Sequence, residues 1–172
     1  MKQFNILKGR HYSRWRWTKL FHPRWNHKKW SLVVILGEGW WWDKPRNNDD
    51  YDLDKIYGTG FGFDHHKNSW RLACRPNFIK KNTVFVYGYT YDAREGKHVS
   101  KELGEHTINK PYKWTIESAD GKYRFINLDL GIKEDMPNTL PDCKLQFDLS
   151  PYAGGNNVSK DDRVCWIEFK PM

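Results

Sequence analysis

The segment Asp54–Arg75 constrains the fold of this chain more than any other, because a glycine-rich run, a histidine pair and a basic strand follow one another in it. Its sequence is DKIYGTGFGFDHHKNSWRLACR. Glycine adopts backbone angles that residues with side chains avoid, so three alternating glycines favour a sharp bend. We therefore predict a tight turn over residues 56–63 between two strands, the second of which begins at Ser69.

Short apolar and aromatic segments recur along the rest of the chain. Ser31–Leu36, SLVVIL, is rich in β-branched residues and is expected to be a central strand. Ala119–Gly121 lies between two such segments as a hairpin turn. Since no long segment has helical periodicity, we predict an all-β fold, an antiparallel two-sheet β-sandwich. The predicted strands are 31–36, 69–74, 83–91, 98–103, 112–118, 123–128, 144–147 and 163–169.

The first thirty residues differ in charge from the rest. Lys2–Lys29 contains basic residues, several tryptophans and no acidic residue. We place a boundary there, with a basic, Trp-rich N-terminal segment or arm at 1–30 and the β-sandwich at 31–172. In an extended chain Trp15 and Trp17 share one face, as in a half-buried edge strand or a clamped arm. Basic residues between aromatic ones also suit nucleic acid or an acidic protein surface, which stay as alternatives.

Length and composition argue against a multidomain, a membrane-spanning and a secreted protein. At 172 residues the chain fits one domain. No stretch approaches the roughly 20 apolar residues of a membrane span. The N-terminus lacks the apolar run of a signal peptide. The three cysteines lie far apart in the sequence, which suits reduced, buried thiols in a cytosolic setting.

We predict neither a cofactor nor a metal site. His65 and His66 are adjacent, but no third ligand stands at a recognisable metal spacing. Asp50, Asp52 and Asp54 alternate without the turn glycine and terminal Glu of a calcium loop, which favours a solvated acidic loop. No paired catalytic carboxylates can be picked out.

Thr83–Tyr91, TVFVYGYTY, is the clearest strand. Its alternation places one aromatic row on one face, formed by Phe85, Tyr87, Tyr89 and Tyr91. On an exposed face these rings could stack on sugars and donate hydroxyl hydrogen bonds. On an inward face the row would be core, and we favour a core or protein-interface role.

Three motifs carry a resemblance to a known family. They are KGRHYS at Lys8–Ser13, the segment Asp54–Arg75, and PYAGGN at Pro151–Asn156. In this order they look like an uncharacterised family of small proteins in Bacteroidota and their phages, with the approximate pattern KGxHYS, HHKNSARFGW and PYFGGN. Trp70 and Ala153 depart from that pattern.

A second, more remote resemblance is to the concanavalin-like jelly rolls of polysaccharide lyases and lectins. It rests on the glycine-rich run before an arginine-bearing strand and on the late GG turn. The resemblance implies a concave sheet that receives glycan, with Arg71 or Arg75 neutralising a uronate carboxylate. His65 or His66 would then act as base and a tyrosine as acid. A structural histidine pair is the alternative that we favour.

From these observations we expect a non-enzymatic structural or interaction protein, most plausibly a phage virion component that decorates a capsid or belongs to a tail. The expected partners are other virion proteins or further copies of the chain, and the expected location is the virion or the cytoplasm of the producing cell. A carbohydrate-binding module or a polysaccharide lyase is the alternative. The residues proposed for ligand contact are Arg71, Arg75, Tyr87, Tyr89 and Tyr91.

Overall fold

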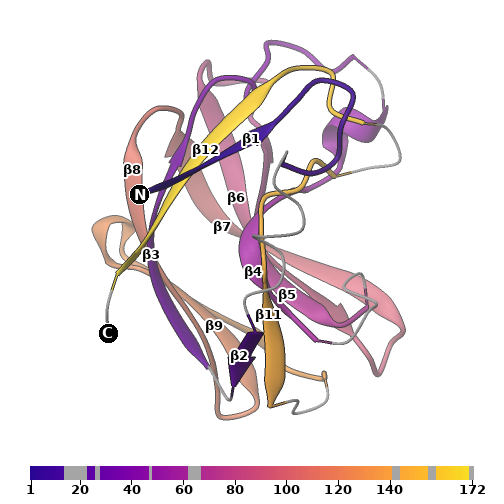
Figure 1. The fold of residues 1–172 in the computed structure, drawn as a ribbon, viewed down its shortest axis with the longest axis vertical. Helices are drawn as coiled ribbons and strands as arrows, with labels where there is room; N and C mark the ends of the chain where they lie inside the picture. The colour runs from indigo at the N-terminus through magenta and orange to yellow at the C-terminus, as the bar shows by residue number, and fades with distance from the viewer. Residues whose placement is uncertain are drawn as a thin grey trace.

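Two six-stranded sheets lie face to face and enclose one hydrophobic core, as the computed structural model shows (Figure 1). Neighbouring strands are antiparallel throughout. The structure describes residues 1–13, 23–25, 28–46, 48–61, 67–140, 144–154 and 158–170. The predicted fold class, an all-β antiparallel sandwich, is confirmed.

The strands of each sheet come from distant parts of the chain. Sheet A has, in order, β1 (Lys2–Ile6), β12 (Arg163–Lys170), β3 (Lys29–Leu36), β8 (Pro111–Ala119), β9 (Lys122–Asn127) and β10 (Ile132–Pro137). Sheet B has β2 (Pro23–Trp25), β11 (Leu145–Leu149), β4 (Asp54–Gly60), β5 (Ser69–Pro76), β6 (Thr83–Asp92) and β7 (Lys97–Thr107). Two short 3-10 turns are η1 (Asn48–Tyr51) and η2 (Leu128–Leu130). Among the described residues, no helix is long and apolar enough to cross a membrane.

Alternate side chains of each strand fill the core, and the others face outward. On β5 the core residues are Trp70, Leu72 and Cys74. The Trp70 ring of sheet B stacks on Tyr123 of sheet A, with 4.6 Å between centroids. Cys74 and Cys165 are buried free thiols, as expected from the sequence, and the third cysteine, Cys143, lies outside the described residues. The outward residues of β5 are also mostly buried, Ser69, Arg71 and Ala73 among them.

Strands in which apolar and polar residues alternate strongly lie close to their predicted positions. β3 is an interior strand of sheet A, as predicted. Asp120 and Gly121 both have positive φ, 54° and 68°, and form the predicted hairpin turn between β8 and β9. The prediction missed β1, β2, β4 and β10.

The predicted turn over residues 56–63 is wrong for its first half, because β4 continues to Gly60. Gly58 stands opposite Arg71 in the β4–β5 pairing. A Cβ atom at Gly58 would lie 2.2 Å from the Trp70 carbonyl oxygen and 2.7 Å from Cγ of Arg71. The glycine is therefore needed for close approach between strands rather than for a bend.

Gly58→Ala is expected to lower the free energy of unfolding by about 1–3 kcal/mol, because the added methyl group forces β4 away from β5. Chemical denaturation measures the change. Ser100→Ala is the control, because Ser100 is an exposed residue of β7 and its substitution should change the free energy of unfolding by less than about 0.5 kcal/mol. Equal stability of Gly58→Ala and the wild type would contradict the close packing of these strands.

The N-terminal segment is part of both sheets. β1 pairs with β12 in sheet A, and the two strands lie side by side in Figure 1. β2 pairs with β11 in sheet B. Both described strands of the N-terminal segment therefore pair with strands of the sandwich, and the boundary placed at residue 30 stays a prediction. Residues 14–22, which include Trp15 and Trp17, lie outside them.

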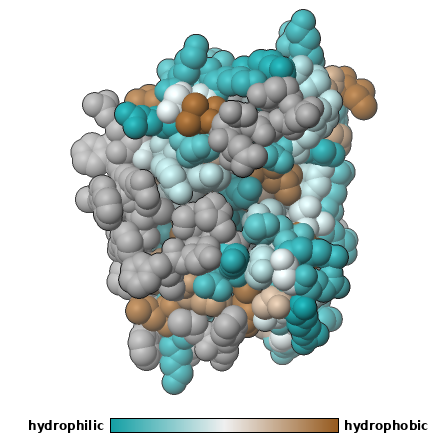
Figure 2. Space-filling model, turned by 90° about the vertical axis from the view of Figure 1, so that its right-hand side faces the viewer, coloured by the Kyte–Doolittle hydropathy of each residue, from teal (hydrophilic) through white to brown (hydrophobic). Residues whose placement is uncertain are grey.

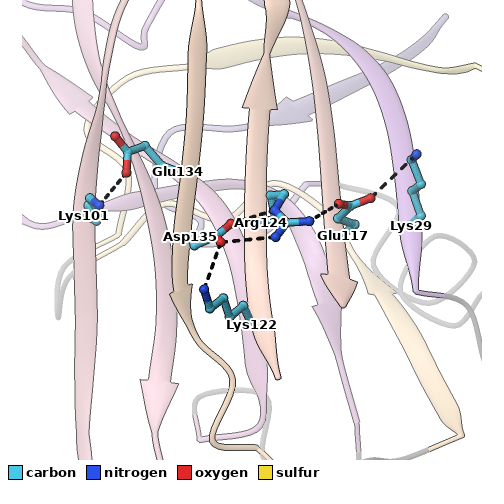
Figure 3. Close-up of polar contacts among 7 residues, drawn as sticks. All are labelled: Lys29, Lys101, Glu117, Lys122, Arg124, Glu134 and Asp135. Atoms are coloured by element: carbon cyan, nitrogen blue, oxygen red, sulfur yellow. Dashed lines mark hydrogen bonds and ion pairs between the residues drawn. The ribbon is translucent and has the colours of Figure 1, made fainter. Parts of the chain in front are cut away.

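The outer face of sheet A carries a row of paired charges (Figure 3). Lys29 of β3 lies 3.7 Å from Glu117 of β8, and Glu117 lies 3.2 Å from Arg124 of β9. Arg124 in turn contacts Asp135 of β10 at 2.8 Å, and Lys122 approaches Asp135 at 3.5 Å. Lys29, Glu117, Arg124 and Asp135 stand opposite one another across adjacent strands, and Lys122 reaches Asp135 diagonally, so these charges are compensated within the sheet.

The two sheets are also joined by charge along one side of the sandwich. Lys101 of β7 contacts Glu134 of β10 at 2.5 Å, and Figure 3 shows this pair beside the row on sheet A. β7 and β10 are the last strands of sheets B and A. The ion pair therefore bridges the open edges of the two layers.

Candidate functional site

The aromatic row of β6 lies on the outer face of sheet B. Val84 and Val86 are fully buried in the core, so the alternate residues point the other way. In the β5–β6 pairing Tyr89 stands opposite Arg71, and Phe85 stands opposite Arg75. The row is therefore not core as a whole, because Tyr89 and Phe85 share the outer face with two arginines, although Tyr91 packs against the edge of the core. A protein-interface role for the row stays a prediction.

Arg71 is buried although it lies on an outer face. Its side chain is only 5% exposed. Among the described residues it has neither a hydrogen-bond acceptor nor a carboxylate within ion-pair distance, and its electrostatic neighbours are Tyr89, Tyr12 and Tyr152. Burial lowers the pKa of Arg71 to about 10, so the guanidinium stays charged at neutral pH. Burying a cation without an anion is costly, and the described residues place no carboxylate beside Arg71 to offset that cost.

Tyr152 is held over Arg71 by backbone pairing with β4. The N–H of Lys55 donates to the Tyr152 carbonyl at 2.8 Å, and the Tyr152 N–H donates back to Lys55 at 2.9 Å. Ala153 donates its N–H to the His11 carbonyl at 2.8 Å. The Tyr12 and Tyr152 rings meet edge to face at 4.9 Å.

Three separate sequence motifs thus converge at Arg71, namely Lys8–Ser13, Asp54–Arg75 and the described part of Pro151–Asn156. We call the cluster of Arg71, Lys55, Tyr12, Tyr89 and Tyr152 the Arg71 site.

A buried ion pair fixes the segment that carries Tyr152. Asp54 accepts the Gly154 N–H at 2.7 Å and pairs with Arg163 of β12. The two charged side chains are 6% and 7% exposed. The Arg163 guanidinium also lies 5.6 Å from the Trp40 ring centroid and 5.2 Å from that of Trp42. The predicted solvated acidic loop is therefore wrong for Asp54, which is a buried partner of the site.

Burial shifts the pKa values of the amine and the phenols of the site in opposite directions, down for Lys55 and up for the tyrosines. Burial, followed by the charge of Arg71, lowers the pKa of Lys55 to about 8. Burial raises the pKa of Tyr89 to about 12, against the opposing effect of Arg71. Burial also raises the pKa of Tyr152. At neutral pH the tyrosines therefore keep their protons, and Lys55 loses its proton more readily than an exposed lysine.

The other predicted residues form separate groups. The Arg75 guanidinium lies 5.7 Å from the Phe85 centroid and 5.4 Å from that of Tyr87, and Tyr87 donates to Glu102 at 3.0 Å. Four residues of strand separate Arg75 from Arg71, about 13 Å. Tyr91 meets the His98 ring edge to face, at 5.3 Å, near the end of β6. His65 and His66 lie outside the described residues.

Sequence reasoning missed Lys55, Tyr12 and Tyr152. The two tyrosines lie inside the motifs on which the family resemblance rests, but no pattern of nearby residues marks either one as a ligand-binding or catalytic group. Lys55 stands in the segment predicted to precede a turn. Their proximity depends on pairing between residues far apart in the chain, which a single sequence does not reveal.

The two outer faces differ in their polar chemistry. On sheet A the acidic and basic side chains of the charged row pair with one another, whereas on sheet B the described electrostatic neighbours of Arg71 are tyrosines. Figure 2, which shows the side on the right of Figure 1, is mainly hydrophilic where described residues form it, with apolar atoms in separate patches. Among the described residues there is no group of three or more potential metal ligands.

The fold is similar to that of solved polysaccharide lyases. Alginate lyase AlyC3 superposes with a TM-score of 0.58 at 12% identity, over 98% of this chain and 74% of that enzyme. An alginate lyase from Klebsiella pneumoniae superposes with a TM-score of 0.54 at 12% identity, over 83% of this chain. The matched part is 57% of the Klebsiella enzyme's own length. The two antiparallel sheets of this chain are thus arranged as in the jelly-roll sandwich of these alginate lyases.

No protein-family model matches the chain, and no curated protein matches it. The comparisons therefore support the remote resemblance to lyase jelly rolls and give no support to the family in Bacteroidota and phages. The expectation of a phage virion component is contradicted, because the structural neighbours are alginate lyases. One of these neighbours, AlyC3, is also known in complex with dimannuronate.

Proposed function

We propose that this protein binds a uronate-containing polysaccharide on the outer face of sheet B and cleaves it by β-elimination. The observation that carries the proposal is Arg71, a buried guanidinium without an anionic partner among the described residues. A planar carboxylate accepts two parallel hydrogen bonds from a guanidinium. A uronate carboxylate would therefore supply the missing charge.

β-Elimination requires a neutralised carboxylate, a base for the C5 proton and an acid for the leaving oxygen. Arg71 would neutralise the carboxylate and so stabilise the negative charge that develops when C5 loses its proton. Tyr152 is the proposed acid, because it stays protonated beside Arg71. The jelly-roll fold shared with alginate lyases supports this choice of reaction.

Arg75 and Tyr87 are proposed to contact a neighbouring sugar, since they lie farther along the same face. A role for Tyr91, His65 or His66 stays a prediction, as do the cytoplasmic location and the motif-level resemblance to proteins of Bacteroidota. The proposal replaces the expectation that the protein is not an enzyme.

The proposal is tested by incubating the protein with a panel of polyuronates and following the ultraviolet absorbance of unsaturated products. We expect product from at least one polyuronate and saturable binding to it. Tyr152→Phe should lower kcat by about 100-fold or more and leave binding within about threefold, because only the proton is removed. Tyr51→Phe is the matched control, since Tyr51 is exposed and contacts Phe78 instead of the Arg71 site.

A non-catalytic glycan-binding protein is the second candidate, and the outward aromatic row of β6 favours it. Saturable binding without any product would select this candidate. If no polyuronate binds and none is cleaved, both candidates are wrong.

A further inference from the structure

Lys55 is placed beside Arg71 on the outer face of sheet B. It stands opposite Ala73 of β5, and Arg71 is two residues away on the same face. Its Nζ donates to the Leu53 carbonyl at 2.6 Å. The same atom lies 4.6 Å from the Tyr89 ring centroid and 6.0 Å from that of Tyr152. The amine is thus fixed by one hydrogen bond and directed toward the aromatic groups around Arg71.

The charged and titratable groups described around Lys55 come from β4 and the residues just before it, from β5 and β6, and from the segment of Tyr152. Arg71 of β5 opposes protonation of the amine, and Asp54 and Asp52 favour it. Cys74 of β5 favours it weakly, and the rings of Tyr89 and Tyr152 lie against the amine. Burial outweighs the acidic neighbours, so about half of the Lys55 side chains are neutral near pH 8.

We propose that Lys55 is the catalytic base of the elimination, an inference that rests on the lyase function proposed above. In the neutral form one N–H can donate to Leu53, which leaves the lone pair free. That lone pair takes the C5 proton of the uronate, and the C5–H electrons form the C4–C5 double bond. The C4–O bond breaks, and Tyr152 protonates the departing oxygen. Transfer of a proton from the Lys55 ammonium to the Tyr152 phenolate restores both groups.

Two histidines border the Arg71 site, since His11 stacks on Tyr152 and His98 stacks on Tyr89, each with 5.3 Å between ring centroids. Within the Arg71 site itself, Arg71, Tyr89 and Tyr152 are poorer bases than Lys55. Arg71 stays protonated at working pH. Burial disfavours the phenolates of Tyr89 and Tyr152. Lys55 is therefore the group at the described site that changes its charge closest to neutrality.

Replacement of the amine separates catalysis from binding. We expect Lys55→Met and Lys55→Arg each to lower kcat on the cleaved polyuronate by about 10²–10⁴-fold. Lys55→Arg keeps the positive charge but cannot give it up, so its Kd should stay within about threefold of the wild type. Lys113→Met is the control, because Lys113 is an exposed residue of β8 in sheet A, whereas Lys55 belongs to sheet B.

The pH profile provides a readout that a structural role would not change. In the wild type kcat should rise with pH through about 8, as Lys55 loses its proton. Lys55→Cys treated with bromoethylamine regains an amine of lower basicity, so activity should return with its acid limb at lower pH. Wild-type protein treated in the same way controls for alkylation of the natural cysteines.

Two outcomes overturn the assignment of Lys55 while leaving the proposed function intact. One is a wild-type kcat in Lys55→Met, and the other is restored activity in the alkylated variant with an unmoved acid limb. If the wild type neither binds nor cleaves any polyuronate, the proposed function fails and the assignment fails with it.

Discussion

Arg71→Met is expected to abolish glycan binding while raising the free energy of unfolding. Arg71 is buried and has no anionic partner among the described residues, so the folded protein bears the cost of its desolvation. Methionine fills a similar volume without charge, and replacements of buried ions by apolar residues are neutral or stabilise by about 1–4 kcal/mol. Loss of a bidentate, charge-assisted contact should weaken glycan binding by about 100-fold or more.

The two effects are measured by denaturant unfolding and by titration with the polyuronate that the wild type binds. Arg94→Met is the matched control, since Arg94 is exposed in the turn between β6 and β7. It makes the same change of charge and should alter neither quantity measurably. Destabilisation of Arg71→Met together with unchanged binding would mean that Arg71 is a structural residue and that the proposed function is wrong.

Asp54→Ala should destabilise the protein by about 3–5 kcal/mol, because it leaves the buried Arg163 without its anion. The substitution also removes the acceptor of the Gly154 N–H, which lies two residues from Tyr152. We therefore expect weaker glycan binding even under conditions in which the variant is fully folded.

A double substitution distinguishes the ion pair from simple loss of packing. Asp54→Ala combined with Arg163→Met removes both charges, so much of the lost stability should return. Denaturant unfolding of the two single variants and the double variant measures the coupling. Additive losses in the double variant would show that Asp54 and Arg163 do not stabilise the fold as a pair.

Strong alternation made much of the sandwich predictable. The strand at Thr83–Asp92 combines β-branched and aromatic residues with strict period-two order, and it forms as expected. β4 was missed because glycine in a strand has the same local signature as glycine in a turn. The structure distinguishes a strand glycine from a turn glycine here, because a Cβ atom added at Gly58 would lie 2.2 Å from the Trp70 carbonyl oxygen of the neighbouring strand. The short edge strand β2 has just three residues, too few to show a period.

The candidate site was predictable only in part. Arg71 and Tyr89 were both named from the sequence, because each stands on a recognisable strand. Their orientation away from the core could not be assigned, since either face of β6 carries apolar residues. Lys55 and Tyr152 come together through a bridge between residues almost a hundred positions apart, and no local pattern reports such a contact.

The ion pair between Lys101 and Glu134 has a consequence for how molecules of this protein meet one another. Unpaired edge strands offer backbone groups to a second chain and so promote aggregation, and charged side chains along an edge discourage this. β7 and β10 are such edges, and charged residues are frequent on both. Because Lys101 and Glu134 also bind across the gap between the sheets, strand addition at that side would have to break the pair. We therefore expect this edge to resist pairing with a second copy of the chain.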